Sequence, residues 1–238
     1  MQIDEYRQRW SEKDSLRAIY ADLHRRMLAA SIEGPSLEIG GGIGNFSSKK
    51  GTLVRMDVQQ SLGVDLVADA HSLPFADGAF ANVYLFDVLH HIQCPIKFIW
   101  EAERVLQMGG RVVMIEPGIT PVSNIIYGIG HKEPVDLSWV PSDDCVPDPR
   151  KDPYDSNQAI PTILFHRFPH LFNDAGFSLR VISTHWLSLF AYPLSGGFRP
   201  WSLIPLRLVS PLLRLEDLLM PVLGRLMAFR LMVVLEKQ

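Results

Sequence analysis

The sequence predicts an α/β fold in which helices cover both faces of a mostly parallel β-sheet. Short apolar runs rich in branched side chains recur along the chain and are separated by turns and helical stretches. Several runs are apolar at every position, as over residues 112–115, which is typical of strands buried on both faces. A glycine cluster directly follows the first run. Together these observations indicate one domain built around a central sheet.

Composition and charge narrow the class of protein. The chain has 238 residues, with 23 basic and 26 acidic side chains and a formal net charge of -3. This balance, without long blocks of one sign, argues against a nucleic-acid partner. The only two cysteines, Cys94 and Cys145, exclude a scaffold of several disulfides and fit a reducing compartment.

The apolar segments of the chain indicate where the protein is located. The N-terminal residues carry charges where a signal peptide would need an apolar core. The longest uncharged run, residues 181–198, contains too many polar and helix-breaking residues for a membrane span. We therefore expect a cytoplasmic protein, a location that allows peripheral contact with a membrane.

The domain organisation follows from shifts in pattern along the chain. Apolar side chains recur at helical intervals near the N-terminus, and the strand-like runs begin at Pro35. Two segments interrupt the alternation because they are rich in proline, so only short helices are expected in the second of them, residues 187–224. The single domain, residues 1–238, is expected to comprise a helical cap over 1–34, the sheet core over 35–117, an insertion over 118–161, a helix and strand over 162–186, an apolar insertion over 187–224 and a final strand over 225–238.

The strongest local signal is the stretch LEIGGGIGNF at residues 37–46. Glycines allow the backbone to turn sharply and to approach a ligand, and free N–H groups at a helix start favour a phosphate or carboxylate. A dinucleotide fingerprint that begins at Gly40 would need a glycine where this chain has Asn45, and the P-loop sequence is absent. The glycines alone therefore leave open which ligand binds, and a turn without a ligand is the alternative.

Two aspartates at later strand ends favour a nucleoside-type ligand. Asp57 ends the second strand-like run, where an acidic side chain can accept both ribose hydroxyls. Asp69 closes the next run, where its carboxylate could accept from an adenine amino group. Each aspartate alone could be a solvated strand-end residue, but glycine, aspartate and aspartate at three successive strand ends are less easily explained by chance.

These motifs resemble the class I S-adenosylmethionine-dependent methyltransferases, in particular the broad methyltransferase type 11 group that includes quinone-biosynthesis enzymes. The resemblance rests on LEIGGGIGNF, the strand end at Asp57, VDLVADAHSLPFADGAFANVYLFDVLHHI, EAERVLQMGGRVVMIEP and HLFNDAGFSLRVIS. It implies a Rossmann-like, seven-stranded sheet in the order 3-2-1-4-5-7-6, with the last strand, FRLMVVLEK, antiparallel. It also implies S-adenosyl-L-methionine as the cofactor.

The resemblance further implies which residues contact the cofactor. These are Glu38, Gly40, Gly41, Gly42 and Gly44 around the methionine part, Asp57 and Val58 at the ribose, Asp69 and Ala70 at the adenine, and Phe86 at the edge of the site. The chain departs from the family where helices usually flank the ribose aspartate, because residues 45–51 and 58–63 leave room for little more than a turn each.

Candidate catalytic residues are few because methyl transfer depends mainly on aligning the acceptor with the methyl group. A base is needed only if the acceptor starts protonated. His90 and His91 follow the fourth strand, and His131 lies in the proline-rich insertion; each could instead be a packing or loop residue. The acidic stretch within residues 142–155 has no regular ligand spacing, so we expect no metal.

The acceptor is expected to be a small or amphiphilic molecule, with lipid-linked and glycan-related acceptors included. Residues 118–161 and 187–224 supply aromatic side chains for a lid over such a molecule, or for the core beneath long loops. The leucine- and arginine-containing part of 187–224 could also contact a membrane surface or a second subunit. The alternatives to an enzyme of this kind are a non-catalytic nucleotide-binding protein on the same fold and, less favoured, an NAD-dependent oxidoreductase.

Overall fold

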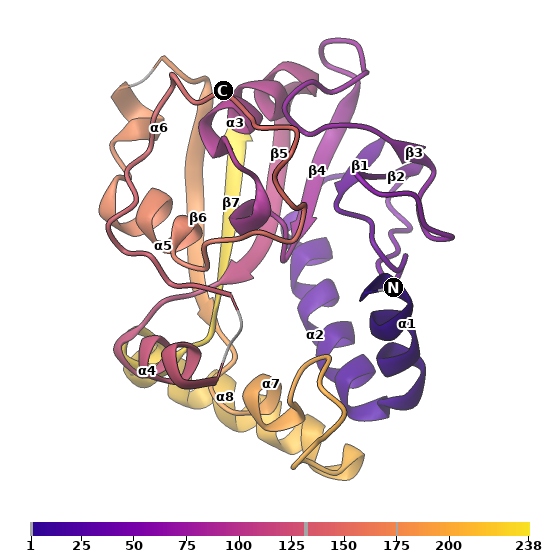
Figure 1. Cartoon of the computed structure of the whole chain (residues 1–238), viewed down its shortest axis with the longest axis vertical. Coiled ribbons are helices and arrows are strands. Elements are labelled where there is room, and N and C mark those ends of the chain that lie inside the picture. The colour runs from indigo at the N-terminus through magenta and orange to yellow at the C-terminus, as the bar shows by residue number, and fades with distance from the viewer. Residues whose placement is uncertain (1, 131–132, 175) are drawn as a thin grey trace.

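The computed structural model describes residues 2–130, 133–174 and 176–238 and confirms the predicted fold class. A seven-stranded sheet in the order β3-β2-β1-β4-β5-β7-β6 forms its centre (Figure 1). The strands are β1 (Ser36–Ile39), β2 (Leu53–Asp57), β3 (Leu66–Val67), β4 (Phe80–Phe86), β5 (Leu106–Pro117), β6 (Leu179–Leu187) and β7 (Arg230–Lys237).

The direction of the strands agrees with the resemblance. The pairs β1–β2, β1–β4, β2–β3 and β4–β5 are parallel, whereas β7 runs antiparallel to both β5 and β6. Because β1, β2, β4 and β5 are parallel, their carboxyl ends meet at one edge of the sheet, which is where ligands bind in open α/β sheets.

Both faces of the sheet are buried, as the apolar runs predict. On β5, Val112 and Met114 belong to one apolar cluster, while Val113 and Ile115 belong to a second cluster on the other face. α3 (Pro95–Val105) packs into the first cluster and α2 (Asp14–Ala30) into the second. The sheet is thus the middle layer between two helical layers.

The remaining helical elements are short except for α1, α4 and α8. They are α1 (Gln2–Glu12), the 3-10 turn η1 (Leu89–His91), α4 (Pro121–Gly130), α5 (Ile160–Thr162), the π-helical turn η2 (Ile163–Arg167), α6 (Leu171–Asp174), α7 (Ala191–Ser195) and α8 (Leu206–Met227). Residues 40–52 contain no helix, in line with the short connection expected before Asp57. None of the helices in the described residues is both long and apolar enough to cross a membrane.

α8 corrects the expectation that residues 187–224 form only short helices. It has 22 residues and contains Pro211 and Pro221. Both prolines are exposed, so the backbone bonds that they remove lie away from the face that packs against the protein through Val209, Glu216 and Gly224. α8 ends at Met227 and β7 begins at Arg230, so the helix also occupies the start of the segment expected to be the last strand.

A disulfide joins the two cysteines, which the sequence analysis did not anticipate. Cys94 immediately precedes α3, and Cys145 lies in the proline-rich insertion, 51 residues further along the chain, with a Cα–Cα distance of 5.5 Å. The bridge therefore fixes the insertion beside the start of α3.

Candidate active site

The glycine loop after β1 is forced into its shape by close neighbours. Gly40 has φ +71°, and a Cβ atom there would lie 2.2 Å from Cγ2 of Val88. Gly44 also has φ +71°, and its Cβ would lie 2.8 Å from the Cα of Gly63. Glycine is required at both positions because a side chain would meet both backbone strain and a clash. The loop therefore packs between Val88, which follows β4, and Gly63, which follows β2.

Asp57 ties this loop to the end of β2. Its two carboxylate oxygens accept hydrogen bonds from the backbone N–H groups of Gly42 and Gln59, each at 2.9 Å. The N–H of Gly41 donates to the carbonyl of Met56 at 2.9 Å. Val58, the next residue, is exposed. The structure thus brings together the glycine loop and the aspartate that were singled out separately in the sequence.

Glu38, on β1 just before the loop, is a buried carboxyl with an unsatisfied oxygen. It is 5% exposed. Oε2 lies 3.5 Å from Nε of Arg55, and neither atom has a hydrogen-bond partner. Burial raises the pKa of Glu38 to about 8 despite the opposing charge of Arg55. A cationic ligand group beside Glu38 would favour its ionised form.

The region after β3 leaves Asp69 accessible. Its Oδ1 accepts from the backbone N–H of His71 at 2.9 Å and lies 2.7 Å from Nδ1 of the same residue. The Asp69 side chain is 57% exposed, and Ala70 is partly buried against the core. Asp69 therefore remains able to accept further hydrogen bonds.

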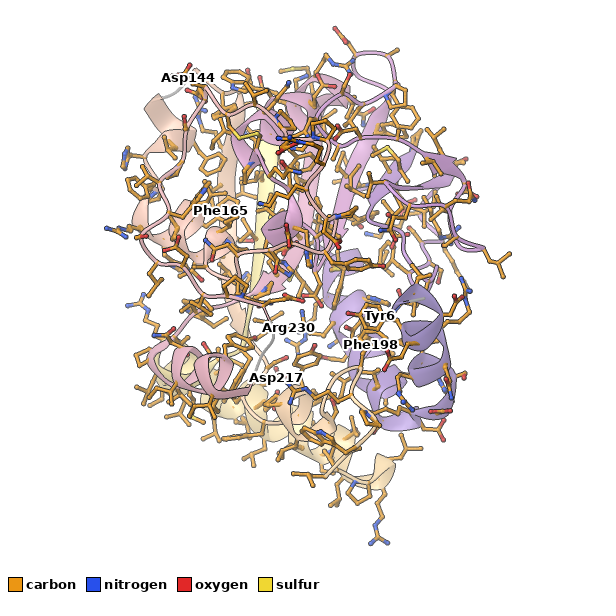
Figure 2. The ribbon with its side chains drawn as sticks, in the orientation of Figure 1. Tyr6, Asp144, Phe165, Phe198, Asp217 and Arg230 are labelled. Carbon is orange, nitrogen blue, oxygen red and sulfur yellow. A yellow bond between two sulfur atoms is a disulfide. The ribbon has the colours of Figure 1, made fainter. Side chains whose placement is uncertain are left out.

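The exit of β4 holds a charged pair that the sequence analysis missed. Asp87 has φ +56° and binds the guanidinium of Arg230 through both carboxylate oxygens, at 2.5 and 2.8 Å. Arg230 is 2% exposed and lies over the rings of Tyr192, at 4.0 Å, and Phe86, at 5.0 Å. In Figure 2 it lies between the end of the sheet and the layer of α7 and α8. Its sequence signal is an arginine directly before the apolar run of residues 231–235.

Phe86 packs within an aromatic group built from distant segments. Tyr20 of α2 stacks on Phe86, with ring centroids 4.8 Å apart, and His24 meets the same ring edge-on at 5.3 Å. Nε2 of His24 is buried without a hydrogen-bond partner, and burial lowers the pKa of this histidine to about 4. The helical cap thus contributes side chains beside the strand ends.

His90 is held between two carboxylates. Its Nδ1 lies 2.7 Å from Oε2 of Glu116, and its Nε2 lies 3.5 Å from Oε2 of Glu133. The other Glu116 oxygen accepts from the backbone N–H groups of Val88 and Leu89. Burial opposes protonation of His90, but the hydrogen bonds to both glutamates outweigh it and raise the pKa to about 9. His90 is therefore cationic at neutral pH.

His91 has the opposite character. Burial, assisted by the charge of His90, lowers its pKa to about 4. The Nδ1 atom of His91 is buried and has no hydrogen-bond partner. His91 is thus a neutral imidazole with a free nitrogen at the exit of β4, whereas His131, the third candidate base, lies outside the described residues.

One group of side chains in the described residues could in principle hold a metal. His90, His91 and Glu133 bring ligand-type atoms within 4.8 Å of one another. A metal at this position would have to displace the proton of His90, since a coordinating imidazole is neutral. Both glutamates favour the protonated form of His90, which opposes coordination of a metal by this ring.

The matching family model and solved structure agree with this geometry. Residues 37–114 match a family model described as "Methyltransferase domain". The crystal structure of a SAM dependent methyltransferase from Archaeoglobus fulgidus shares the fold, with a TM-score of 0.54 and 14% identity over 93% of this chain and 94% of that chain.

The curated relatives match only part of the chain. An uncharacterized protein of Methanocaldococcus jannaschii is 31% identical over 90 residues, which cover 34% of this chain and 44% of that protein. An uncharacterized 37.1 kDa protein in transposon TN4556 of Streptomyces fradiae is 43% identical over 51 residues, 21% of this chain and 15% of that protein. The matches therefore span less than half the length of either relative.

The chain thus shares the fold of the SAM dependent methyltransferase from Archaeoglobus fulgidus. The match of residues 37–114 to the family model indicates a methyltransferase domain, for which the cofactor is S-adenosylmethionine. The more specific resemblance to the quinone-biosynthesis group stays a prediction.

Proposed function

We propose that the protein transfers the methyl group of S-adenosylmethionine to a small or amphiphilic acceptor at the carboxyl ends of β4 and β5. The observation that carries this proposal is the buried oxygen of Glu38 beside the glycine loop, which accepts no hydrogen bond and has only the distant ion pair with Arg55, at 3.5 Å. A buried carboxyl without a hydrogen-bond donor favours a donor group beside it, and the cofactor carries an ammonium on its methionine part. The residues present therefore fit the cofactor.

Each predicted contact has a place in this proposal. Asp57 holds the ribose, because a carboxylate that already accepts two backbone N–H groups has further lone pairs for hydroxyl donors. The remaining contacts are Gly40, Gly41, Gly42 and Gly44 along the methionine part, Val58 beside the ribose, Asp69 and Ala70 at the adenine, and Phe86 at the edge of the site.

The chain's own task is to align the acceptor and to remove its proton where it has one. When bound, S-adenosylmethionine supplies a methyl group that its sulfonium makes electrophilic. His91 Nδ1 is the candidate acceptor for the proton of a hydroxyl, since this nitrogen is neutral and has no hydrogen-bond partner. Its low pKa suits a proton that becomes acidic as the oxygen is methylated and is too low to deprotonate an ammonium. His90, fixed by Glu116 and Glu133, acts as a positioning residue for the adjacent ring of His91.

The first test is calorimetry with S-adenosylhomocysteine. Asp57→Ala should weaken binding by about 1–3 kcal/mol through the loss of charged hydrogen bonds. Asp144→Ala, a change in the exposed proline-rich insertion, is the matched control and should leave the affinity as it is. Gly42→Val should block the cofactor, while circular dichroism shows an intact fold.

The outcomes separate the alternatives. An unchanged affinity in Asp57→Ala would show that the ribose assignment is wrong. A wild-type protein that binds no cofactor at millimolar concentration would overturn the proposed activity and favour a non-catalytic protein. Preferential binding of NAD would favour the oxidoreductase.

A further inference from the structure

A row of large aliphatic side chains is exposed on α4 and α8. We call it the α4–α8 face. Its members on α8 are 46–79% exposed and those on α4 are 47–84% exposed. They are Leu208, Leu215, Leu218, Val222 and Leu226 of α8 and Ile125, Ile126 and Ile129 of α4. Soluble surfaces usually carry such residues singly, so a row of this size calls for an explanation.

Helix geometry makes the part of the row on α8 continuous. Leu208, Leu215, Val222 and Leu226 follow one another at intervals of seven, seven and four residues, which keeps them on one side of a helix. The buried residues of α8, among them Val209, lie on the opposite side. α4 packs against α8, and the two helices lie together at one end of the molecule (Figure 1).

Arginines follow one edge of this row. Arg207, Arg214 and Arg225 are spaced by seven and eleven residues, so they form a second line beside the aliphatic one. Within the ranges that the structure describes, none of the three has an ion-pair partner.

The acidic residues of α8 do not offset these arginines. Glu216 is buried and accepts hydrogen bonds from the backbone N–H groups of Phe190 and Ala191. Asp217, which is labelled in Figure 2, pairs with Arg26 of α2 at 2.7 Å. The edge of the α4–α8 face is therefore cationic.

We infer that the α4–α8 face binds the surface of an anionic lipid bilayer. Aliphatic side chains on one side of a helix and arginines along its edge match the acyl boundary and the phosphate layer of such a surface. The charge favours this occupant over a second copy of the chain, because symmetric contact through the same face would bring unpaired arginines toward one another. α8 is fixed against α2 and β6, so it lies in the plane of the bilayer surface.

The face adjoins the candidate active site. α4 begins at Pro121, shortly after β5 ends, and α8 leads into Arg230 at the start of β7. An amphiphilic acceptor held in the bilayer would thus lie beside the strand ends. This last step rests on the proposed function, whereas binding to the bilayer does not.

Vesicle flotation without cofactor tests the inference. The protein should float with phosphatidylglycerol vesicles, bind phosphatidylcholine vesicles at least about tenfold more weakly, and dissociate as salt is raised. Leu218→Asp combined with Val222→Asp should abolish flotation. Arg207→Gln, Arg214→Gln and Arg225→Gln together should remove the preference for phosphatidylglycerol. Met108→Asp, at a 68% exposed site near the opposite end of β5, is the matched control and should float like the wild type.

The inference is overturned if the wild type does not float, or if both groups of substitutions leave flotation unchanged. Self-association that the Leu218→Asp and Val222→Asp pair removes, without any vesicle binding, would also overturn it in favour of a second copy. Circular dichroism confirms that each variant is folded. A failure to bind S-adenosylhomocysteine would contradict the proposed function and leave the flotation result as it stands.

Discussion

At the scale of single residues, neighbouring side chains of one type take opposite protonation states. His90 and His91 are adjacent, yet the pKa of the first is about 9 and that of the second about 4. Desolvation lowers the pKa of both histidines, so it cannot by itself explain the difference. Glu116 and Glu133 reach His90, whereas Nδ1 of His91 has no hydrogen-bond partner. The difference in pKa between these two neighbours therefore depends on partners that are distant in sequence.

Glu38 gives a prediction of pH dependence. The pKa of Glu38 is about 8 in the free protein, so this carboxyl is mostly protonated below pH 8. If the ammonium of the cofactor pairs with the carboxylate, binding below pH 8 must release this proton. The dissociation constant for S-adenosylhomocysteine should thus rise as pH falls from 8 to 6, by up to about tenfold per pH unit. Glu38→Gln should bind more weakly at pH 8 and lose this dependence. Calorimetry across pH measures it, with Glu33→Gln, an exposed change, as control.

The raised pKa of Glu38 also predicts how the stability of the protein changes with pH. A carboxyl whose pKa is raised by folding stabilises the folded state below its unfolded value of 4.5 and loses that contribution as pH rises through 8. Glu38→Gln should therefore be more stable relative to wild type at pH 9 than at pH 5. Equal pH profiles of binding and melting in the two proteins would contradict the role of Glu38.

At the scale of elements, the strands were predictable and the longest helix was not. Residues 112–115 are apolar at every position, which predicts a strand buried on both faces. The glycines after the first strand likewise predict the loop. α8 was not predictable, because prolines in a sequence normally indicate that a helix is interrupted. Pro211 and Pro221 are exposed, and this exposure depends on how the finished helix packs. The Asp87–Arg230 pair joins residues 143 positions apart, and no local pattern reports such a contact.

Lys13 connects the start of α2 to residues 195–201 through hydrogen bonds to backbone carbonyls. It lies between α1 and α2, is 8% exposed, and its Nζ donates to the carbonyls of Ser195, Gly197, Arg199 and Trp201 at 2.6–2.9 Å. An ammonium has only three N–H donors, so one is shared. Lys13→Met keeps the apolar stem but leaves these buried carbonyls unpaired.

We expect Lys13→Met to cost about 3 kcal/mol, which corresponds to a fall in melting temperature of roughly 6–12 °C for a chain of this size. Tyr6 and Phe198, which pack with ring centroids 5.0 Å apart (Figure 2), hold the same loop against α1 and limit the loss. Thermal unfolding followed by circular dichroism measures the change. Lys97→Met, at an exposed site on α3, is the control, and equal melting temperatures in the two variants would show that the carbonyl cluster does not depend on Lys13.

At the scale of the whole molecule, a disulfide joins the proline-rich insertion to the start of α3. Cys94 and Cys145 gave no spacing signal, because two cysteines 51 residues apart can be free or paired. Glu133, the second carboxylate beside His90, belongs to the same insertion. The disulfide therefore connects the stability of the fold to the order of the candidate active site.

Reduction of this disulfide should lower stability by up to about 4 kcal/mol, because a closed loop of this length restricts the unfolded chain by that amount. Melting temperature should fall when reductant is added to the wild type and should stay constant in Cys94→Ser/Cys145→Ser, which controls for other effects of the reductant.

The glycine loop lies outside the insertion, so affinity for S-adenosylhomocysteine should persist while methyl transfer declines as Glu133 loses its fixed position beside His90. Equal melting temperatures of the wild type with and without reductant would show that the bridge does not stabilise the protein. A parallel loss of cofactor affinity and turnover would instead mean that the insertion supports the whole strand-end edge.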